Sequence, residues 1–197
     1  RWFSPLKEMP LCGHATLAAS RVLFGKEPWS DLLVFRYAGG ILQARRHSDD
    51  SIGIDFPLDE YLQCPPDPVF NDFFGPLQLR DCIYGQRTKK VVLVASDGTD
   101  LADIVPDFRR MAEYRGFCSN GIAITKASSV FDFESRYFNP WAGVNEDPVT
   151  GSVHTLLAKY WSDRLNKKCL AAFQSSGRPG ELLLSVDDGS VEIRGKA

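Results

Sequence analysis

The alternation of hydrophobic and polar positions predicts a chain made mostly of short β-strands. Brief apolar or alternating runs recur along the sequence and are bounded by Gly, Pro, Asp and Ser, which is the pattern of strands joined by turns. We expect strands at 1–3, 33–37, 41–45, 52–56, 91–94, 121–125, 131–138, 182–186 and 191–193. Gly39-Gly40 and the segment 187–190 carry residues that are typical of hairpin turns.

Two longer segments, 14–24 and 151–165, have the properties of helices and contain no proline. In the second, large apolar residues recur every three or four positions, which is the period of a helix face. These residues are Val153, Leu156, Leu157, Tyr160, Trp161 and Leu165. A shorter helix is expected within 101–114, after Pro106. Many strands with few helices predict the α+β class.

The chain also repeats itself. The segment Arg1-Trp2-Phe3-Ser4-Pro5 returns as Arg136-Tyr137-Phe138-Asn139-Pro140, and each copy leads to a small-residue turn before a predicted helix, at Gly13 and at Gly151. Such self-similarity predicts a duplicated fold with two half-sites that face each other across a cleft. Three prolines within 65–68 mark the best linker, so we expect one domain at 1–62 and a second at 63–197.

Composition and charge argue against several classes of protein, including nucleic-acid-binding and membrane-spanning proteins. A net charge of -2 and a pI of about 5.9 offer no basic stripe for nucleic acid, and we interpret Lys89-Lys90 as solvated surface. No apolar run approaches the ~20 residues of a membrane span, so we expect a cytoplasmic protein. The five cysteines contain no CxxC pair, and their odd number excludes a fully paired disulfide framework.

Both ends of the chain have the pattern of interrupted strands. Arg1 already belongs to a predicted strand whose copy at 131–138 is longer, and the strand at 191–193 is followed by only a few residues. We therefore expect the fold to be truncated at both ends.

The glycines at the two helix starts are the centre of a candidate binding site. The first N–H groups of a helix have no partner within the helix and bind anions, and a glycine lets a ligand approach them. Superposing Gly13 on Gly151 makes His14 the counterpart of Ser152. Together with Asp147, these side chains have the chemistry to exchange a proton with a substrate carbon and to hold its carboxylate or carbonyl.

Simpler roles stay open for the same residues. Asp147 precedes Pro148 and also fits a turn or capping residue, and His14 also fits a structural hydrogen-bonding residue. We interpret His154 as packed or exposed rather than catalytic, and His47 as a surface residue. The recurrence of the cluster in both copies favours the functional interpretation.

Cys12 offers a rival mechanism, in which two thiols at one α-carbon remove and return a proton. Its counterpart in the second copy is Thr150, and no cysteine lies near Ser152 in the sequence. A two-thiol racemase therefore lacks its second thiol, and we interpret Cys12 as a small packed residue.

The two turn regions together resemble the signature regions of the PhzF-like phenazine-biosynthesis family. The resemblance rests on 1–5 with 11–18, where Leu-Cys-Gly-His-Ala-Thr-Leu-Ala stands, and on 136–138 with 146–152, where Glu-Asp-Pro-Val-Thr-Gly-Ser stands. It extends over the whole chain, including 171–174 and 191–195, and is closest to animal members of the family.

The resemblance implies a fold and a chemistry. Members of the family have the diaminopimelate-epimerase-like fold, with two similar domains of β-strands around a central helix and the active site between them. The implied activity is isomerisation or epimerisation by proton transfer next to a carbonyl or carboxylate of a small anionic substrate, without a metal or a cofactor. Carried over by motif, Asp147 and His14 are the catalytic residues, and Gly13, Gly151 and Ser152 bind the substrate.

The resemblance also limits what we expect of this chain. The family's principal acid/base is a glutamate upstream of the first strand, which places it before Arg1, so the chain alone is expected to be incomplete and inactive. The alternative function is a non-catalytic protein-interaction module that keeps the fold, because animal members are known partly through a protein partner. A homodimer is a further expectation, from the prevalence of twofold assemblies.

Overall fold

The computed structural model of the chain describes residues 1–3, 8–9, 11–27, 29–116 and 120–196. Ser4 and Pro5, which belong to the repeated segment, lie outside the described residues. The helices are α1 (Gly13–Lys26), α2 (Val69–Phe74), α3 (Phe108–Glu113) and α4 (Gly151–Leu165), with short 3₁₀ turns η1 (Leu101–Asp103) and η2 (Pro140–Ala142). The strands are β1 (Trp2–Phe3), β2 (Glu8–Met9), β3 (Leu32–Tyr37), β4 (Gly40–Arg46), β5 (Ile52–Pro57), β6 (Tyr61–Gln63), β7 (Leu79–Gly85), β8 (Val91–Ala95), β9 (Ile122–Ala127), β10 (Phe133–Asn139), β11 (Val144–Glu146), β12 (Cys169–Gln174), β13 (Gly180–Asp187) and β14 (Ser190–Gly195).

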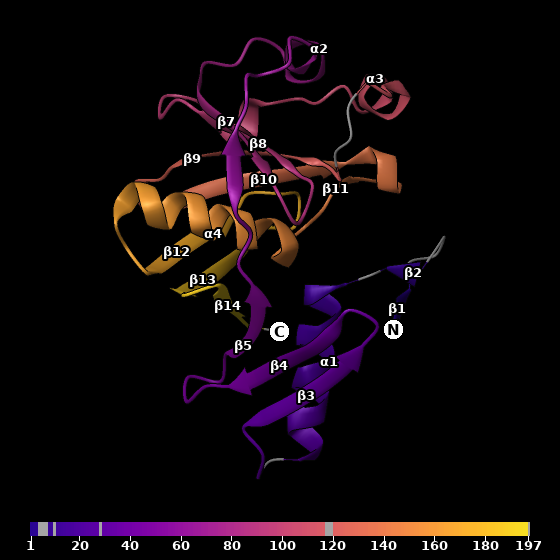
Figure 1. The fold of residues 1–197 in the computed structure, drawn as a ribbon, viewed down its shortest axis with the longest axis vertical. Coiled ribbons are helices and arrows are strands. Elements are labelled where there is room, and N and C mark those ends of the chain that lie inside the picture. Colours follow the sequence, from indigo (N-terminus) through magenta and orange to yellow (C-terminus); the bar gives the residue numbers. More distant parts are fainter. Residues whose placement is uncertain (4–7, 10, 28, 117–119, 197) are drawn as a thin grey trace.

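Most strands join one sheet of 12 strands in the order β3-β4-β5-β14-β13-β12-β10-β9-β8-β7-β6, with β11 attached to β10 (Figure 1). Neighbours are antiparallel except for the parallel pairs β10–β12 and β8–β9. The pairing of β14 with β5 connects the hairpin β3–β4 to the rest of the sheet. The sheet thus continues across the predicted boundary after residue 62, and that boundary stays a prediction. Its strands and few helices confirm the α+β class.

The core is built around α4, whose buried side chains lie on nearly every side of the helix. They are Val153, His154, Thr155, Leu156, Leu157, Ala158, Tyr160 and Trp161. The apolar ones among them form one cluster with residues of β4, β5, β12, β13 and β14. A helix that is apolar on all sides has to be covered on all sides, and the curved sheet provides that cover.

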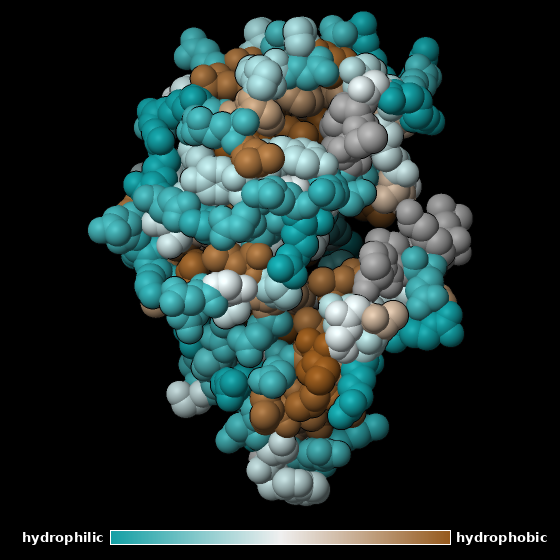
Figure 2. All heavy atoms as spheres, in the orientation of Figure 1, coloured by the Kyte–Doolittle hydropathy of each residue, from teal (hydrophilic) through white to brown (hydrophobic). Residues whose placement is uncertain are grey.

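The helix of the first copy, α1, is covered much less. Its buried residues are Thr16, Ser20 and Phe24, which form a single stripe at four-residue spacing. Val22 on α1 and Val34 on β3 are 59% and 53% exposed. Figure 2 shows apolar side chains gathered on the lower part of the molecule, where α1, β3 and β4 lie in Figure 1.

The structure contains both predicted long helices, the short helix after Pro106 and both predicted hairpins. The sequence analysis missed α2, which begins directly after the proline-rich segment that we interpreted as a linker. Asp67 Oδ1 accepts a hydrogen bond from the backbone N of Val69 at 3.0 Å, and three phenylalanines of α2 are buried. An Asp-Pro pair before an apolar run is a signal for a helix start, and it stands in the sequence at Asp67 and Pro68.

The two copies of the repeat contain the same ion pair in the same surroundings. Arg1 makes two hydrogen bonds to Glu8, at 2.8 and 2.7 Å, and Arg136 makes two to Glu146, at 2.7 and 2.8 Å. Arg1 directly precedes β1 and Arg136 lies in β10, and their glutamates lie on the strands that pair with these, β2 and β11. Each guanidinium lies 5.0 Å from the ring of the phenylalanine two residues further along the chain. These matches support the duplication and make Glu146, rather than Asp147, the counterpart of Glu8.

The two ion pairs differ in burial, which predicts different contributions to stability. The side chains of Arg136 and Glu146 are 11% and 18% exposed, against 70% and 43% for Arg1 and Glu8. Arg136 also donates to two backbone carbonyls around η1, at 2.8 and 2.7 Å.

We expect Arg136→Met to lower the free energy of unfolding by about 3 kcal/mol, because it leaves a buried carboxylate and two carbonyls without their donor. The matched variant Arg1→Met removes the exposed copy of the pair and is expected to leave the free energy of unfolding unchanged. Urea denaturation of the two variants measures the difference. An equal fall in the free energy of unfolding of both variants would contradict the larger contribution that we assign to the buried pair.

Candidate active site

The two helices that carry the predicted site residues begin side by side. A Cβ atom on Gly13 would lie 3.7 Å from the Cα of Gly151, and a Cβ atom on Gly151 would lie 3.8 Å from the Cα of Gly13. The ring of Phe56 on β5 would lie 3.4 and 3.9 Å from these same two positions. The two helix starts therefore lie within ordinary van der Waals distance of each other, as the duplication predicts.

Both helix starts keep their N–H groups available. The residues that precede the helices, Cys12 and Thr150, are extended, and neither makes a side-chain capping hydrogen bond. Neither helix has an acidic residue in its first turn. The backbone of Ala15 in the first turn of α1 interacts with Cys12. The first N–H groups of the two helices carry a partial positive charge and converge on one place. Figure 2 shows a hollow between the lower and upper parts of the molecule, close to where these helix starts lie in Figure 1.

Cys12 and His14 are in contact, with 3.4 Å between Cys12 Sγ and His14 Nε2. The hydrogen bond with Cys12 raises the pKa of His14, and the charge of Asp147 adds to that effect. Burial raises the pKa of Cys12, but the hydrogen bonds with His14 and with the backbone of Ala15, together with the charge of His14, outweigh it, so that this pKa lies below its ordinary value. Cys12 is therefore an electrostatic partner of His14, which the interpretation as a packed residue did not include.

Asp147 lies between β11 and α4, on the side of the second copy. Its Oδ2 accepts a hydrogen bond from Thr150 Oγ1 at 2.5 Å, and its backbone N donates to the carbonyl of Tyr137 at 3.1 Å. Its charge acts on both Cys12 and His14, so the carboxylate lies within electrostatic reach of the first copy. Ser152 is half-buried in the first turn of α4.

Gln174 holds the turn that carries Asp147, and the sequence analysis missed this role. The residue is fully buried at the end of β12. Its Oε1 accepts a hydrogen bond from the backbone N of Thr150 at 2.8 Å, and its Nε2 donates to the carbonyl of Asp147 at 2.7 Å. A polar residue that ends an apolar strand was the available signal, but its partners lie more than twenty positions away.

The interpretation of Lys90 as solvated surface is wrong. Lys90 is 7% exposed, and its ammonium lies 5.2 Å from the ring centroid of Tyr137. Burial lowers the pKa of Lys90 to about 8, although the charges of Asp59 and Asp147 oppose this shift. Lys90 therefore places a buried ammonium near the carboxylate of Asp147. His47, which we interpreted as a surface residue, is partly exposed, with its Nε2 3.1 Å from a carboxylate oxygen of Glu192.

His154 is buried in α4, one turn beyond the start of the helix. Its Nδ1 lies 2.8 Å from the carbonyl of Thr150, and its ring stacks on Phe133 with 6.0 Å between centroids. Its Nε2 is buried and has no hydrogen-bond partner among the residues that the structure describes. Burial lowers the pKa of His154 to about 4, so the ring is neutral at pH 7. Of the two environments that we expected for His154, packed or exposed, the structure shows the packed one.

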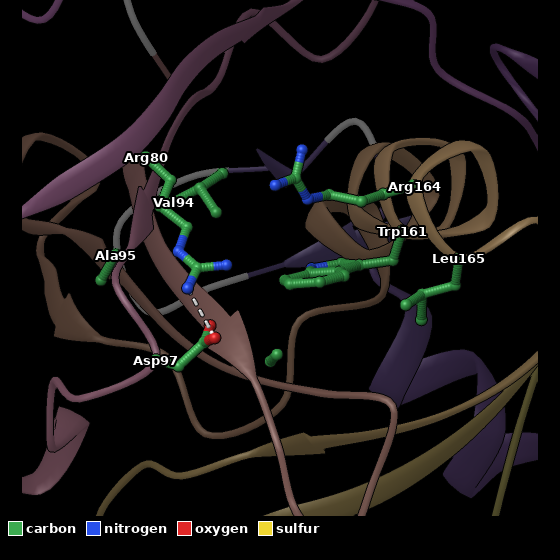
Figure 3. A pocket seen from close by; sticks show the side chains of 8 residues that line it. Arg80, Val94, Ala95, Asp97, Trp161, Arg164 and Leu165 are labelled. Carbon is green, nitrogen blue, oxygen red and sulfur yellow. Dashed lines mark hydrogen bonds and ion pairs between the residues drawn. The ribbon is translucent and has the colours of Figure 1, made fainter.

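A cavity of about 440 Å³ lies at the other end of α4 (Figure 3). The side chains of Arg80 and Arg164 enter it from β7 and α4, beside the indole of Trp161. Arg80 lies 2.6 Å from a carboxylate oxygen of Asp97, and Arg164 lies 3.6 Å from one of Asp81. Because its positive charges are paired and it lies about 20 Å along the helix from the first turn of α4, this cavity is not the predicted pair of half-sites.

Within the ranges given above, no group of three or more His, Cys, Asp or Glu side chains is arranged to hold a metal ion. No helix in the same ranges is both long and apolar enough to cross a membrane.

Replacing Gln174 is expected to loosen the turn that holds Asp147. Gln174→Ala leaves one buried N–H and one carbonyl without partners, so we expect the free energy of unfolding to fall by about 2 to 4 kcal/mol. The matched variant Gln43→Ala changes an exposed glutamine on β4 and is expected to have no effect. Urea denaturation of both variants tests this, and equal stability of the two would contradict the role of Gln174.

The burial of neutral His154 is expected to make the protein less stable in mild acid. The pKa of His154 is about 4 in the folded protein and about 6.5 in the unfolded chain, so the unfolded chain binds the proton more tightly. The contribution of His154 to the free energy of unfolding is fully present above pH 6.5 and falls as the pH decreases toward 4. We expect this residue to contribute a loss of about 2 kcal/mol between pH 7 and pH 5. The difference between the denaturation curves of the wild type and His154→Gln at each pH isolates this contribution, and a difference that stays constant with pH would contradict it.

Comparison with known proteins identifies the family of the chain. The model of the phenazine biosynthesis-like protein family, PhzC-PhzF, matches residues 1–68 and 69–197. The chain is 41% identical over 214 residues to a human phenazine biosynthesis-like domain-containing protein, and 41% identical over 198 residues to a Pseudomonas aeruginosa protein that is named an uncharacterized isomerase. Each match covers 100% of this chain and 73% of the relative.

A solved structure shows the same fold. The crystal structure of a phenazine biosynthesis protein of the PhzF family from Enterococcus faecalis superposes with a TM-score of 0.89 at 35% identity, covering 100% of this chain and 73% of that chain. The chain therefore belongs to the PhzC-PhzF family of phenazine biosynthesis-like proteins and has the α+β fold of that family.

Proposed function

We propose that the protein acts as a PhzF-like isomerase, which moves a proton next to a carbonyl or carboxylate of a small anionic substrate. The observation that carries this proposal is the meeting of two uncapped helix N-termini at Gly13 and Gly151. Such a place favours a negative charge, because unpaired N–H groups and two helix dipoles point at it. The same donors stabilise an enolate, which is the charge that develops when a proton leaves a carbon next to a carbonyl.

The side chains around the helix starts supply the proton chemistry. Asp147 and His14 come from opposite copies of the repeat, and each is within electrostatic reach of the other. In the proposed reaction these two groups transfer the proton, and Ser152 orients the substrate carboxylate from the first turn of α4. The contact of His14 with Cys12 raises the pKa of the imidazole, which favours the protonated form as a proton donor.

The asymmetry of the two copies favours a carboxylate-based isomerase over a two-thiol racemase. Cys12 and Thr150 occupy the same place before the first glycine of their helices. Only one of them is a thiol, whereas Asp147 has no acidic counterpart now that Glu8 matches Glu146. The name of the Pseudomonas aeruginosa relative as an isomerase agrees with this reaction class.

A glutamate upstream of Arg1 is part of the proposal. The resemblance to the family implies that this residue shares the proton transfer with Asp147 and His14, so we propose that full activity requires it. The activity is therefore to be assayed on the chain as given and on the chain extended by the upstream segment of the family.

A protein-interaction module is the second candidate function. It is favoured by the exposed apolar side chains on α1 and its neighbouring strands, such as Val22 and Val34. An interaction module does not require proton transfer, so an absence of exchange on the extended chain would favour this candidate over the isomerase.

The proposal predicts exchange of a substrate proton with solvent. In D₂O the extended chain is expected to incorporate deuterium next to the carboxylate of one member of a panel of small chiral carboxylic acids, followed by NMR. Asp147→Asn and His14→Ala are each expected to slow the exchange by about 100-fold or more, because each removes a group that transfers the proton. The control Asp163→Asn changes a carboxylate at the far end of α4, half-exposed and paired with Lys159, and should leave the rate unchanged.

Ser152→Ala separates binding from chemistry in the same assay. It is expected to raise KM about tenfold with a smaller effect on kcat, because the hydroxyl positions the substrate rather than transferring the proton. Ser162→Ala, on the same helix but ten positions on, is its matched control. Unchanged exchange in both Asp147→Asn and His14→Ala would overturn the proposed function.

A further inference from the structure

Two cysteines far from the candidate active site are in contact with each other. Cys64 directly follows β6, Cys82 lies in β7, and their Sγ atoms are 3.5 Å apart. The backbone N of Cys64 donates to the carbonyl of Cys82 at 2.9 Å, and the register of the strands pairs the preceding Gln63 with Ile83. The two cysteines are therefore direct neighbours on adjacent antiparallel strands. Their separation of 18 positions in the sequence gave no signal of this contact.

This arrangement suits a disulfide bond. Directly opposite residues on antiparallel strands have Cα atoms about 4.5 to 5.5 Å apart, within the range of about 4.4 to 6.8 Å that disulfides span. Only the sulfur atoms have to approach further, to about 2.05 Å. Rotation of the two side chains provides most of this movement, so the strand pairing can stay as it is.

A small oxidant also has access to the pair. Cys82 is 5% exposed, whereas Cys64 is half-buried. A cavity of about 210 Å³ is lined by both cysteines together with Pro66, Leu79 and Arg80. The cavity is large enough for a molecule of the size of hydrogen peroxide, since a water occupies about 30 Å³ in the liquid. Cys64 is the more accessible of the two sulfur atoms.

We propose that Cys64 and Cys82 are an oxidative modification site, at which a peroxide converts the two thiols into a disulfide. In the first step the Cys64 thiolate attacks hydrogen peroxide, the O–O bond breaks, a sulfenic acid forms and hydroxide leaves as water after taking a proton. In the second step Cys82 gives up its proton as its sulfur attacks that of Cys64, because the thiolate is the nucleophile. The S–S bond forms, the S–O bond breaks, and the departing hydroxide takes up that proton as a second water. The two sulfur atoms lose two electrons in total, and the peroxide gains them.

The environment of the pair assigns the order of the two steps. Burial raises the pKa of Cys82, and the hydrogen bond with Cys64 raises it further, so Cys82 stays protonated as a thiol. The thiolate is the form that reacts with peroxide. The half-buried Cys64 is thus the sulfur that is oxidised first, and Cys82 is the thiol that resolves the sulfenic acid. This site does not depend on the proposed isomerase activity.

The bond would fasten the edge of the sheet. β6 is a strand of three residues that pairs only with β7, at the end of the strand order. A disulfide here ties this edge strand to its neighbour and closes a loop that contains α2. Because the bond restricts the unfolded chain more than the folded one, the oxidised protein is expected to melt roughly 5 to 10 °C higher than the reduced protein.

Peptide mapping after oxidation tests the proposal. The reduced chain is treated with hydrogen peroxide, its remaining thiols are alkylated, and it is digested with trypsin without reduction. Cleavage after Arg80 separates the two cysteines into the peptides 47–80 and 81–87. We expect these peptides to be found joined, with the mass of two hydrogen atoms lost, and to separate when dithiothreitol is added.

Single variants provide the controls for the same experiment. Cys64→Ala and Cys82→Ser each remove the joined peptide and the rise in melting temperature, whereas Cys169→Ser, at an exposed cysteine on β12, keeps both. Alkylation of both Cys64 and Cys82 after peroxide treatment would overturn the proposal. So would a link from Cys64 to any other cysteine or to a second chain, or a Cys64 that is found only as sulfinic acid.

Discussion

The close approach of Gly13 and Gly151 is the constraint on which the rest of the structure depends. Each glycine begins the helix of its own copy of the repeat, and the two backbones lie so close that a Cβ on either would contact the other. The absence of a side chain at both positions leaves the space at the helix starts open to a ligand. The place where the copies meet is therefore also the place where unpaired helix donors meet, so one contact determines both the packing and the candidate site.

The two copies on either side of this contact differ in how much of their structure is buried. α4 is buried on nearly every side, and the Arg136–Glu146 pair on β10 and β11 is mostly inaccessible, whereas α1 buries one stripe and the Arg1–Glu8 pair is exposed. The second copy also fixes its turn through the buried Gln174. The second copy thus provides the rigid side of the candidate site.

The sequence predicted what depends on local pattern. The periodicity of α4, the hairpin turns and the glycines at the helix starts are all visible within a few residues of each other. Contacts between distant positions were not predictable, because a single sequence does not show which residues face each other across a sheet. The hydrogen bonds of Gln174 to the turn before α4, the contact of Cys64 with Cys82 and the burial of Lys90 all belong to this class. Helix α2 is a different case. Asp67 and Pro68 before its apolar run are a signal for a helix start, but we interpreted the three neighbouring prolines as a linker.

The asymmetry of the copies assigns different roles to the two groups of the proposed reaction. A carboxylate stands on the side of the second copy, held by Thr150, and an imidazole stands on the side of the first, with its pKa raised by Cys12. The ammonium of Lys90, although burial lowers its pKa, lies on the side of the carboxylate and interacts with its charge. Because their environments differ, the carboxylate is suited to take a proton in one direction of the reaction and the imidazolium to give one, and the roles reverse in the other direction.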